Sequence, residues 1–263
     1  MKLLSILLLV CIPTCICAQD KVSTEEVKYD DNHTIQVYKA SYVDSLKHFQ
    51  PKRCASKSKL ATLVPQGFSY EGILLENDFD GDGREDCMLS VLATRPEYYY
   101  KDDDGKPHDC NRNGYILAMN RVDHYEVTSF NYECFLPGES ICFEDISYPL
   151  WLDGVSFWNG VLTLHFFGAL GSGMRTEDYE LRYENGDFIL LKHISASMLG
   201  ENGVTSYSQS YDFENGNLHI SNLDNYDGVR WGDADVKPMY KEENKNIPKT
   251  RQIKLSEIVE LPN

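Results

Sequence analysis

The sequence predicts a mainly β protein, an antiparallel meander of hairpins in a sandwich or partial propeller-like fold, with one or two short helices near the N-terminus. The first observation is a recurring Asn-Gly pair, which accepts the positive φ of a type I′ hairpin turn. The second is that strand-length runs flank several of these pairs. The third is the abundance of tyrosine, 17 residues, which favours strands. The pairs are Asn113–Gly114, Asn159–Gly160, Asn185–Gly186, Asn202–Gly203 and Asn215–Gly216.

Three consecutive hairpins are expected in the second half of the chain. Consecutive hairpins at this spacing indicate an antiparallel meander rather than βαβ units. Their strands are predicted at Val155–Phe157 with Val161–Phe166, at Tyr179–Tyr183 with Phe188–Leu191, and at Tyr207–Phe213 with Leu218–Ile220.

The helical patterns lie early in the chain, at Ala40–Gln50 and Arg53–Val64, and the turn Pro65–Gly67 ends the second. The polar segment Gln19–Asn32 is expected to form a loose N-terminal arm. No Gly/Ser/Pro linker interrupts the rest, and an all-β domain routinely reaches about 200–250 residues. We therefore expect residues 19–263 to form a single mainly β domain.

Residues 1–18 have the features of a secretory signal peptide. Lys2 supplies the positive charge, an apolar stretch follows, and Ala18 is the small residue before cleavage at Gln19. The stretch is shorter than the about 20 apolar residues of a transmembrane helix. The protein is therefore expected to be exported, periplasmic or extracellular. A lipid-anchored form is the alternative, through Cys11, Cys15 or Cys17, but none follows the Gly or Ala that a lipoprotein signal prefers.

The charge of the chain excludes two classes of partner. The formal charge is −16, and removal of residues 1–18 takes away one lysine, leaving 24 basic against 41 acidic residues, or −17. Such a surface repels phosphate backbones and anionic headgroups, so neither nucleic acid nor a polybasic membrane mode is expected. It favours divalent cations, and its many aromatic residues suit a glycan or a protein partner.

Five cysteines follow the signal peptide, so at least one thiol cannot pair within the chain. Cys134 and Cys142 flank a turn-like segment and are the expected disulfide. Cys87 lies in an apolar run and is expected to be a buried small hydrophobe.

The segment from Asp78 to Asp86 combines side-chain types and spacing that suit a hard cation. Carboxylates stand at relative positions 1, 3, 5 and 9, a glycine at position 6 permits a sharp turn, and the carbonyl at position 7 can add an oxygen. Calcium accepts six to eight such oxygens in loose geometry, whereas magnesium keeps its waters. A solvated acidic hairpin is the alternative interpretation. The predicted ligands are Asp78, Asp80, Asp82, Asp86 and the carbonyl of Arg84.

The flanks of this segment indicate a strand-loop-strand site. A helical calcium hand needs a bidentate Glu at position 12, and that position is Leu89. The runs Phe68–Leu75 and Cys87–Leu92 on either side have strand character. We therefore expect an ion of modest affinity that braces structure.

The chain resembles a family of exported bacterial proteins, and its aspartate loop is similar to the calcium loops of integrin-like FG-GAP repeats. Three matching elements accompany the loop: Pro65–Gly67, Asn111–Ile116 and Leu181–Phe188. The resemblance spans roughly residues 60–220. It implies a bound calcium ion and a β fold, and it implies no particular reaction.

Two further acidic segments carry a weaker signal. Lys101–Pro107 follows Tyr98–Tyr100 and is expected to be a solvated turn, although these tyrosines and acids could together form a recognition rim. Asp224, Asp227, Asp233 and Asp235, with Trp231 among them, are spaced too irregularly to predict a calcium site.

No catalytic motif accompanies these features. The seven histidines form no metal-binding pattern, and His165 and His219 are expected on sheet faces or in the core. We therefore expect an exported, calcium-braced, non-enzymatic module that binds a glycan, peptide or protein. The alternative is a secreted hydrolase with dispersed carboxylates, which requires two of them roughly 5–10 Å apart in a cleft.

Overall fold

The structure, a computed structural model, describes residues 23–28, 34–137, 150–170, 173–199, 205–224, 239–248 and 251–261. The expected signal peptide lies outside these ranges, as do Cys142 and most of the second acidic segment. The prediction of a mainly β protein with antiparallel hairpins is confirmed. Within the described ranges, no helix combines the length and the apolar character needed to cross a membrane.

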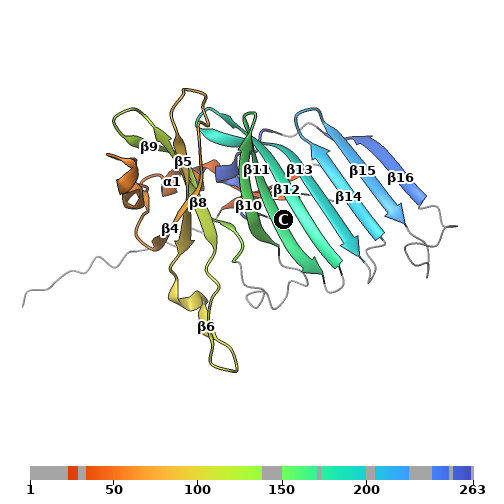
Figure 1. Ribbon diagram of the computed structural model, residues 1–263, viewed down its shortest axis with the longest axis horizontal. Coiled ribbons are helices and arrows are strands. Elements are labelled where there is room, and N and C mark those ends of the chain that lie inside the picture. Colours follow the sequence, from red (N-terminus) through yellow and green to blue (C-terminus); the bar gives the residue numbers. More distant parts are fainter. Residues whose placement is uncertain are drawn as a thin grey trace, which may run out of the picture.

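The second half of the chain forms a seven-stranded antiparallel meander in which every strand pairs with its neighbour in sequence (Figure 1). All three predicted hairpins lie in it. Its strands are β10 (Trp151–Trp158), β11 (Val161–Leu170), β12 (Gly173–Glu184), β13 (Asp187–Leu199), β14 (Thr205–Asp212), β15 (Asn217–Asp224) and β16 (Met239–Asn246).

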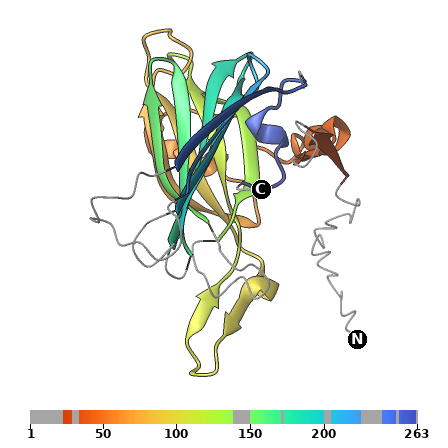
Figure 2. The ribbon, with the colours of Figure 1, turned by 90° about the vertical axis from the view of Figure 1, so that its right-hand side faces the viewer.

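The first half forms a five-stranded antiparallel sheet with the order β3-β9-β8-β5-β4. Two separate hairpins accompany it, β1 with β2 and β6 with β7, and the second projects from the body as an arm (Figures 1 and 2). The strands are β1 (Thr24–Lys28), β2 (Thr34–Tyr38), β3 (Arg53–Cys54), β4 (Phe68–Asn77), β5 (Asp86–Ala93), β6 (Tyr99–Lys101), β7 (Pro107–Asp109), β8 (Asn113–Asn120) and β9 (Tyr125–Phe135).

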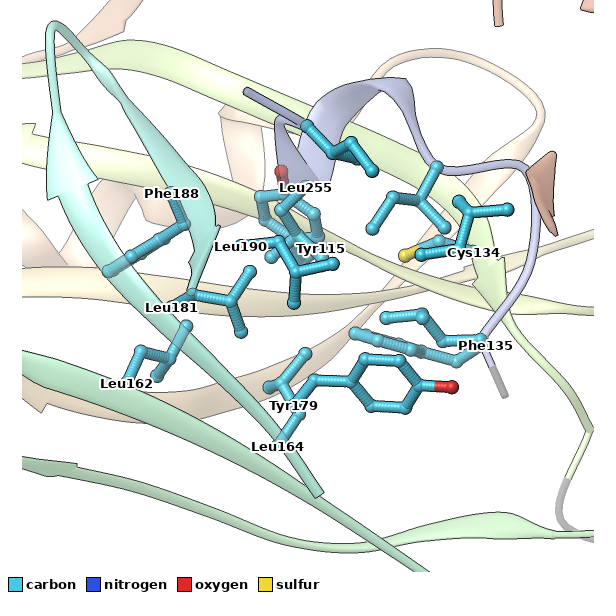
Figure 3. Close-up of a cluster of buried hydrophobic side chains, with 14 of the residues drawn as sticks. Tyr115, Cys134, Phe135, Leu162, Leu164, Tyr179, Leu181, Phe188, Leu190 and Leu255 are labelled. Atoms are coloured by element: carbon cyan, nitrogen blue, oxygen red, sulfur yellow. The ribbon is translucent and has the colours of Figure 1, made fainter. Parts of the chain in front are cut away.

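The two large sheets pack face to face, which makes the architecture a sandwich rather than a propeller. Their facing side chains form one buried cluster, to which β8 contributes Tyr115, and β11 and β12 contribute Leu164, Tyr179 and Leu181 (Figure 3). Leu117 of β8 belongs to the same cluster. Alternate residues of each strand point into this layer, as the period of two of a strand requires.

Short helices cover the opposite face of the five-stranded sheet. Helix α1 (Ala40–Leu46) and the 3₁₀ helix η1 (Lys57–Leu63) lie within the two predicted helical segments. Leu60 and Leu63 of η1 are buried in a second apolar cluster beneath the sheet. The second prediction was too long at its start, since Arg53 and Cys54 pair with β9 instead.

Three of the predicted Asn-Gly pairs, Asn159–Gly160, Asn185–Gly186 and Asn215–Gly216, lie in hairpin turns, Asn113–Gly114 does not, and Asn202–Gly203 lies outside the described residues. Asn159 and Asn185 have φ of 50° and 52° and are followed by glycines that also have positive φ. Asn113–Gly114 instead lies inside β8, where a Cβ on Gly114 would stand 2.1 Å from the backbone oxygen of Asn131. Glycine is required there by the close approach of β9, which the dipeptide alone does not reveal.

The ends of the described chain are tied into the sandwich. Thr24–Lys28, expected in a loose arm, forms β1 and pairs with β2. Near the other end, Leu255, Ile258 and Leu261 are fully buried in the main core. Ile258 bridges to Val37 of β2, so segments from both ends of the chain close the same edge of the core.

The predicted disulfide between Cys134 and Cys142 is wrong. Cys134 is a free thiol, fully buried between the sheets, where it packs as an apolar group. Cys110, just after the arm, is disulfide-bonded instead. Cys87 is free and buried, as predicted.

Candidate metal centre

The aspartate loop is the turn between β4 and β5, at the end of the sandwich opposite the arm (Figure 1). Three of its carboxylates converge: Asp78, Asp80 and Asp86 each offer one oxygen, and these oxygens all lie within 4.8 Å of one another. Three aspartate oxygens at this separation can share one cation, since calcium binds oxygen at roughly 2.3–2.6 Å.

The backbone of the loop folds around the carboxylate of Asp78. The Gly81 and Asp82 N–H groups donate to Asp78 Oδ1 at 2.8 and 3.0 Å, and the Gly83 N–H donates to Oδ2 at 2.8 Å. Gly81 and Gly83 have φ of 77° and 84°, a region that favours glycine. The sequence thus fixes the position of the first predicted ligand through its glycines.

Asp86 is the buried member of the cluster. Its carboxylate accepts the Phe79 N–H at 3.0 Å and the Asn120 N–H, from the end of β8, at 2.8 Å. Burial raises the pKa of Asp86, and the nearby negative charges of Asp80 and Asp82 act in the same direction. A cation at the cluster would oppose both effects, because it favours the charged carboxylate.

Asp82 and Arg84 lie outside the three-carboxylate cluster. Asp82 accepts the Arg84 N–H at 2.9 Å and forms an ion pair with the Arg84 guanidinium group. The Arg84 Nε donates to the backbone oxygen of Asn120 at 2.7 Å, which turns the side chain toward the neighbouring β8–β9 turn. Ligation by Asp82 and by the Arg84 carbonyl therefore stays a prediction.

A second arginine reaches the loop from the β8–β9 turn. Arg121 Nη1 lies 2.8 Å from Asp80 Oδ2, and Arg121 Nε lies 3.4 Å from Glu126. The loop carries four aspartates and Glu85, and the positive groups of Arg84, Arg121 and Lys57, whose Nζ lies 2.9 Å from Glu85, leave a formal charge of −2. One divalent cation would balance that charge.

Phe79 connects the loop to the core. It is 5% exposed, and its ring makes edge contacts with Phe157 at 5.1 Å and Phe188 at 5.5 Å between ring centroids. Phe79, the second residue of the loop, thus packs against the facing sheet, so a displacement of the loop would disturb the packing of the sandwich core.

Sequence reasoning missed the partners that lie far along the chain. Asn120 and Arg121 are 34 and 41 residues from the aspartates that they contact, and no local spacing marks them. The only available signal was that a β meander brings successive turns to one end.

A buried polar group in the seven-stranded sheet was also missed. Glu177 is fully buried, forms an ion pair with Arg175, and accepts the Tyr179 hydroxyl at 2.9 Å. His193 Nε2 lies 3.1 Å from the same carboxylate, and the imidazole ring stacks on Tyr179. Despite burial, the pKa of Glu177 is lowered, chiefly by its hydrogen bond to His193. The Glu177 carboxylate thus has three polar partners on β12 and β13, whereas Nδ1 of His193 is buried without a hydrogen-bond partner.

The two histidines expected on sheet faces or in the core lie on strands. His165 on β11 is partly exposed and forms an ion-pair contact with Asp178 of β12. His219 on β15 has its Nδ1 2.9 Å from Asn244 of β16. These cross-strand contacts are typical of residues that stabilise a sheet face.

Comparisons with protein-family models, with curated proteins and with solved structures found no match. The described residues form a mainly β sandwich with a three-aspartate cluster that could hold a metal ion.

Proposed function

We propose that this protein is an exported, non-enzymatic binding module whose β4–β5 loop holds a structural calcium ion. The observation that carries the proposal is the convergence of Asp78, Asp80 and Asp86, one oxygen each, within 4.8 Å. The spacing similar to FG-GAP loops and the expected signal peptide support the same conclusion.

Calcium fits the cluster better than magnesium. The three converging donors are carboxylate oxygens of the protein, and calcium accepts such oxygens in loose geometry. Magnesium instead retains several waters and needs near-ideal octahedral geometry. Without a bidentate ligand at position 12, the affinity belongs in the range of extracellular modules, roughly 10⁻⁴–10⁻³ M. An exported protein meets calcium at such concentrations.

The ion would brace one end of the sandwich. Asp86 and Asp80 already contact the β8–β9 turn through Asn120 and Arg121. A cation shared by Asp78, Asp80 and Asp86 relieves the repulsion among these carboxylates and holds the two turns together. The module would then present its other surfaces to a glycan, peptide or protein in a fixed orientation.

Thermal unfolding with and without calcium tests the proposal. At 10 mM calcium, about 10–100 times this Kd, the ion adds about 1.4–2.7 kcal/mol, which raises Tm by roughly 3–11 °C for a protein of this size. We expect this rise at 10 mM CaCl₂ over EDTA, a smaller one with MgCl₂, and its loss in Asp80→Asn. Asp104→Asn, an exposed aspartate in the turn of the arm, is the matched control and should keep the rise.

Equal Tm in calcium and EDTA would contradict the calcium site, as would an undiminished rise in Asp80→Asn. The non-enzymatic part has its own check, since release of reducing ends from a polysaccharide by the purified protein would contradict it.

A further inference from the structure

A cavity of about 220 Å³ lies at the root of the arm formed by β6 and β7, at the end of the sandwich away from the aspartate loop (Figure 1). Its wall comes from separate parts of the chain: the segment after β5, the two bases of the arm, the end of β9, and the segment before Leu261. The side chains that matter here are Arg95, Tyr98, Asn111, Arg112, Glu133 and Glu260.

The charged side chains of the wall are paired with one another. Arg95 forms an ion pair with Glu133 of β9, and Arg112 forms one with Glu260. Burial raises the pKa of Glu133, and the charges of Arg95 and Arg112 oppose that effect. The described residues of the wall therefore carry no net formal charge, and their guanidinium donors lie next to carboxylate acceptors.

The base of the arm is held in place by a buried amide. Asn111 is 1% exposed, its Oδ1 accepts the Arg95 N–H at 2.9 Å, and its Nδ2 donates to the Arg95 carbonyl at 3.1 Å. The Cys110 N–H donates to the Tyr98 carbonyl at 2.9 Å, and Cys110 is also disulfide-bonded. A two-stranded hairpin alone is marginally stable, so these contacts make the arm a defined extension of the cavity.

Three exposed tyrosines follow one another at the root of the arm, and the two that belong to β6, Tyr99 and Tyr100, face opposite sides of that strand. Tyr98 lines the cavity and lies beside Arg95, with the guanidinium carbon 5.9 Å from the ring centroid. Tyr98, Tyr99 and Tyr100 are 46, 49 and 37% exposed. The ring of Tyr98 offers an apolar face and a polar edge to a ligand that extends out of the cavity.

These features select one ligand class. An ionic ligand would have to break an existing ion pair and leave a partly buried charge unpaired, which is costly. A hydroxyl group instead donates to a carboxylate and accepts from a guanidinium group, so it can bridge an intact pair. The cavity is smaller than the roughly 300–1,000 Å³ typical of drug-sized ligands, so it admits one small unit.

We propose that this cavity binds one unit of a neutral saccharide through its Arg–Glu pairs, and that Tyr98 stacks against an adjoining unit. This names the ligand class of the binding module proposed above, and it requires no role for the calcium ion in the contact itself.

Isothermal titration calorimetry of the purified protein in calcium buffer tests the inference. The probes are neutral gluco-, manno- and galacto-oligosaccharides of one to six units, with glycylglycine as a zwitterion and inorganic phosphate as an anion. We expect at least one neutral series to bind, with at least tenfold tighter binding for three or more units than for one. Tyr98→Ala and Glu133→Gln should each weaken binding at least tenfold.

Trp158→Ala is the matched aromatic control, because Trp158 is 77% exposed and is the last residue of β10, next to the β10–β11 turn. That turn lies at the other end of the sandwich (Figure 1). It should bind as the unchanged protein does. Tyr98 is exposed, so its variant should fold even if Glu133→Gln does not. Binding of glycylglycine or phosphate alone, no saccharide binding, or unchanged binding in Tyr98→Ala would each overturn the inference.

The calcium-dependent Tm, measured on the same preparations, separates the two proposals. A normal calcium shift without saccharide binding rejects only the ligand class. Saccharide binding without a calcium shift rejects only the metal site.

Discussion

Replacing Phe79 with alanine tests whether the aspartate loop is built into the sandwich core. Phe79 is the second residue of the loop, yet it is 5% exposed and contacts Phe157 and Phe188 of the facing sheet. Truncation leaves a cavity between the sheets and removes two edge-to-face contacts. A solvated acidic hairpin, by contrast, would lose almost nothing.

The expected cost follows from burial. Large-to-small substitutions of buried Phe cost about 3–5 kcal/mol, and a domain has about 5–15 kcal/mol of stability in total. We therefore expect Phe79→Ala to lower the free energy of unfolding by about 4 kcal/mol. The loss should appear in EDTA as well as in calcium, because it arises from packing.

Urea denaturation followed by tryptophan fluorescence measures this loss as a shift of the midpoint urea concentration. The shift reports stability provided that the dependence of the free energy of unfolding on urea concentration is unchanged. Phe49→Ala is the control: Phe49 is 73% exposed, so its truncation should fall within about 0.5 kcal/mol. A loss that small for Phe79→Ala would refute the idea that the loop is anchored in the core.

Three further substitutions probe other parts of the fold. Burial raises the pKa of Asp187. The stability that Asp187 contributes is therefore fully present below its unfolded pKa and is lost as the pH rises through its folded pKa. Tm of Asp187→Asn minus Tm of the unchanged protein should rise from pH 4 to pH 7, and a falling difference would contradict this. Gly114→Ala places a methyl 2.1 Å from a backbone oxygen and should cost more than about 3 kcal/mol. Gly154→Ala, whose added methyl would lie 3.9 Å from the Cβ of His165, should fold with little change in Tm. Asn131→Ala removes the donor to the Ile258 carbonyl at 2.6 Å, so amide hydrogen exchange in residues 251–261 should accelerate by roughly 5-fold or more if about 1 kcal/mol is lost.

Local signals in the sequence were enough to predict the meander. Asn159–Gly160 and Asn185–Gly186 adopt the positive φ that this dipeptide favours, and the flanking strands follow in antiparallel register. Gly114 was wrongly predicted to form a hairpin turn, because glycine is equally suited to a turn and to a close approach of two strands. Only the position of β9 distinguishes the two uses.

The loop was predicted in type and in part of its detail. Spacing identified Asp78, Asp80 and Asp86, since their convergence depends on a turn that the intervening glycines define. It could not reveal that Asp82 pairs with Arg84, or that Arg121 approaches from another turn. Pairing among side chains of opposite charge depends on which turns meet at one end of the sandwich.

The burial of Leu255, Ile258 and Leu261 has a consequence for the order in which the chain can fold. Asn131 contacts the Ile258 carbonyl across 127 residues, and β2 reaches the same segment from near the start. A nascent chain that lacks residues 251–261 leaves one edge of its apolar interior open to solvent. Contacts between such distant segments form slowly, so residues 251–261 are expected to dock late, as the step that closes the apolar interior.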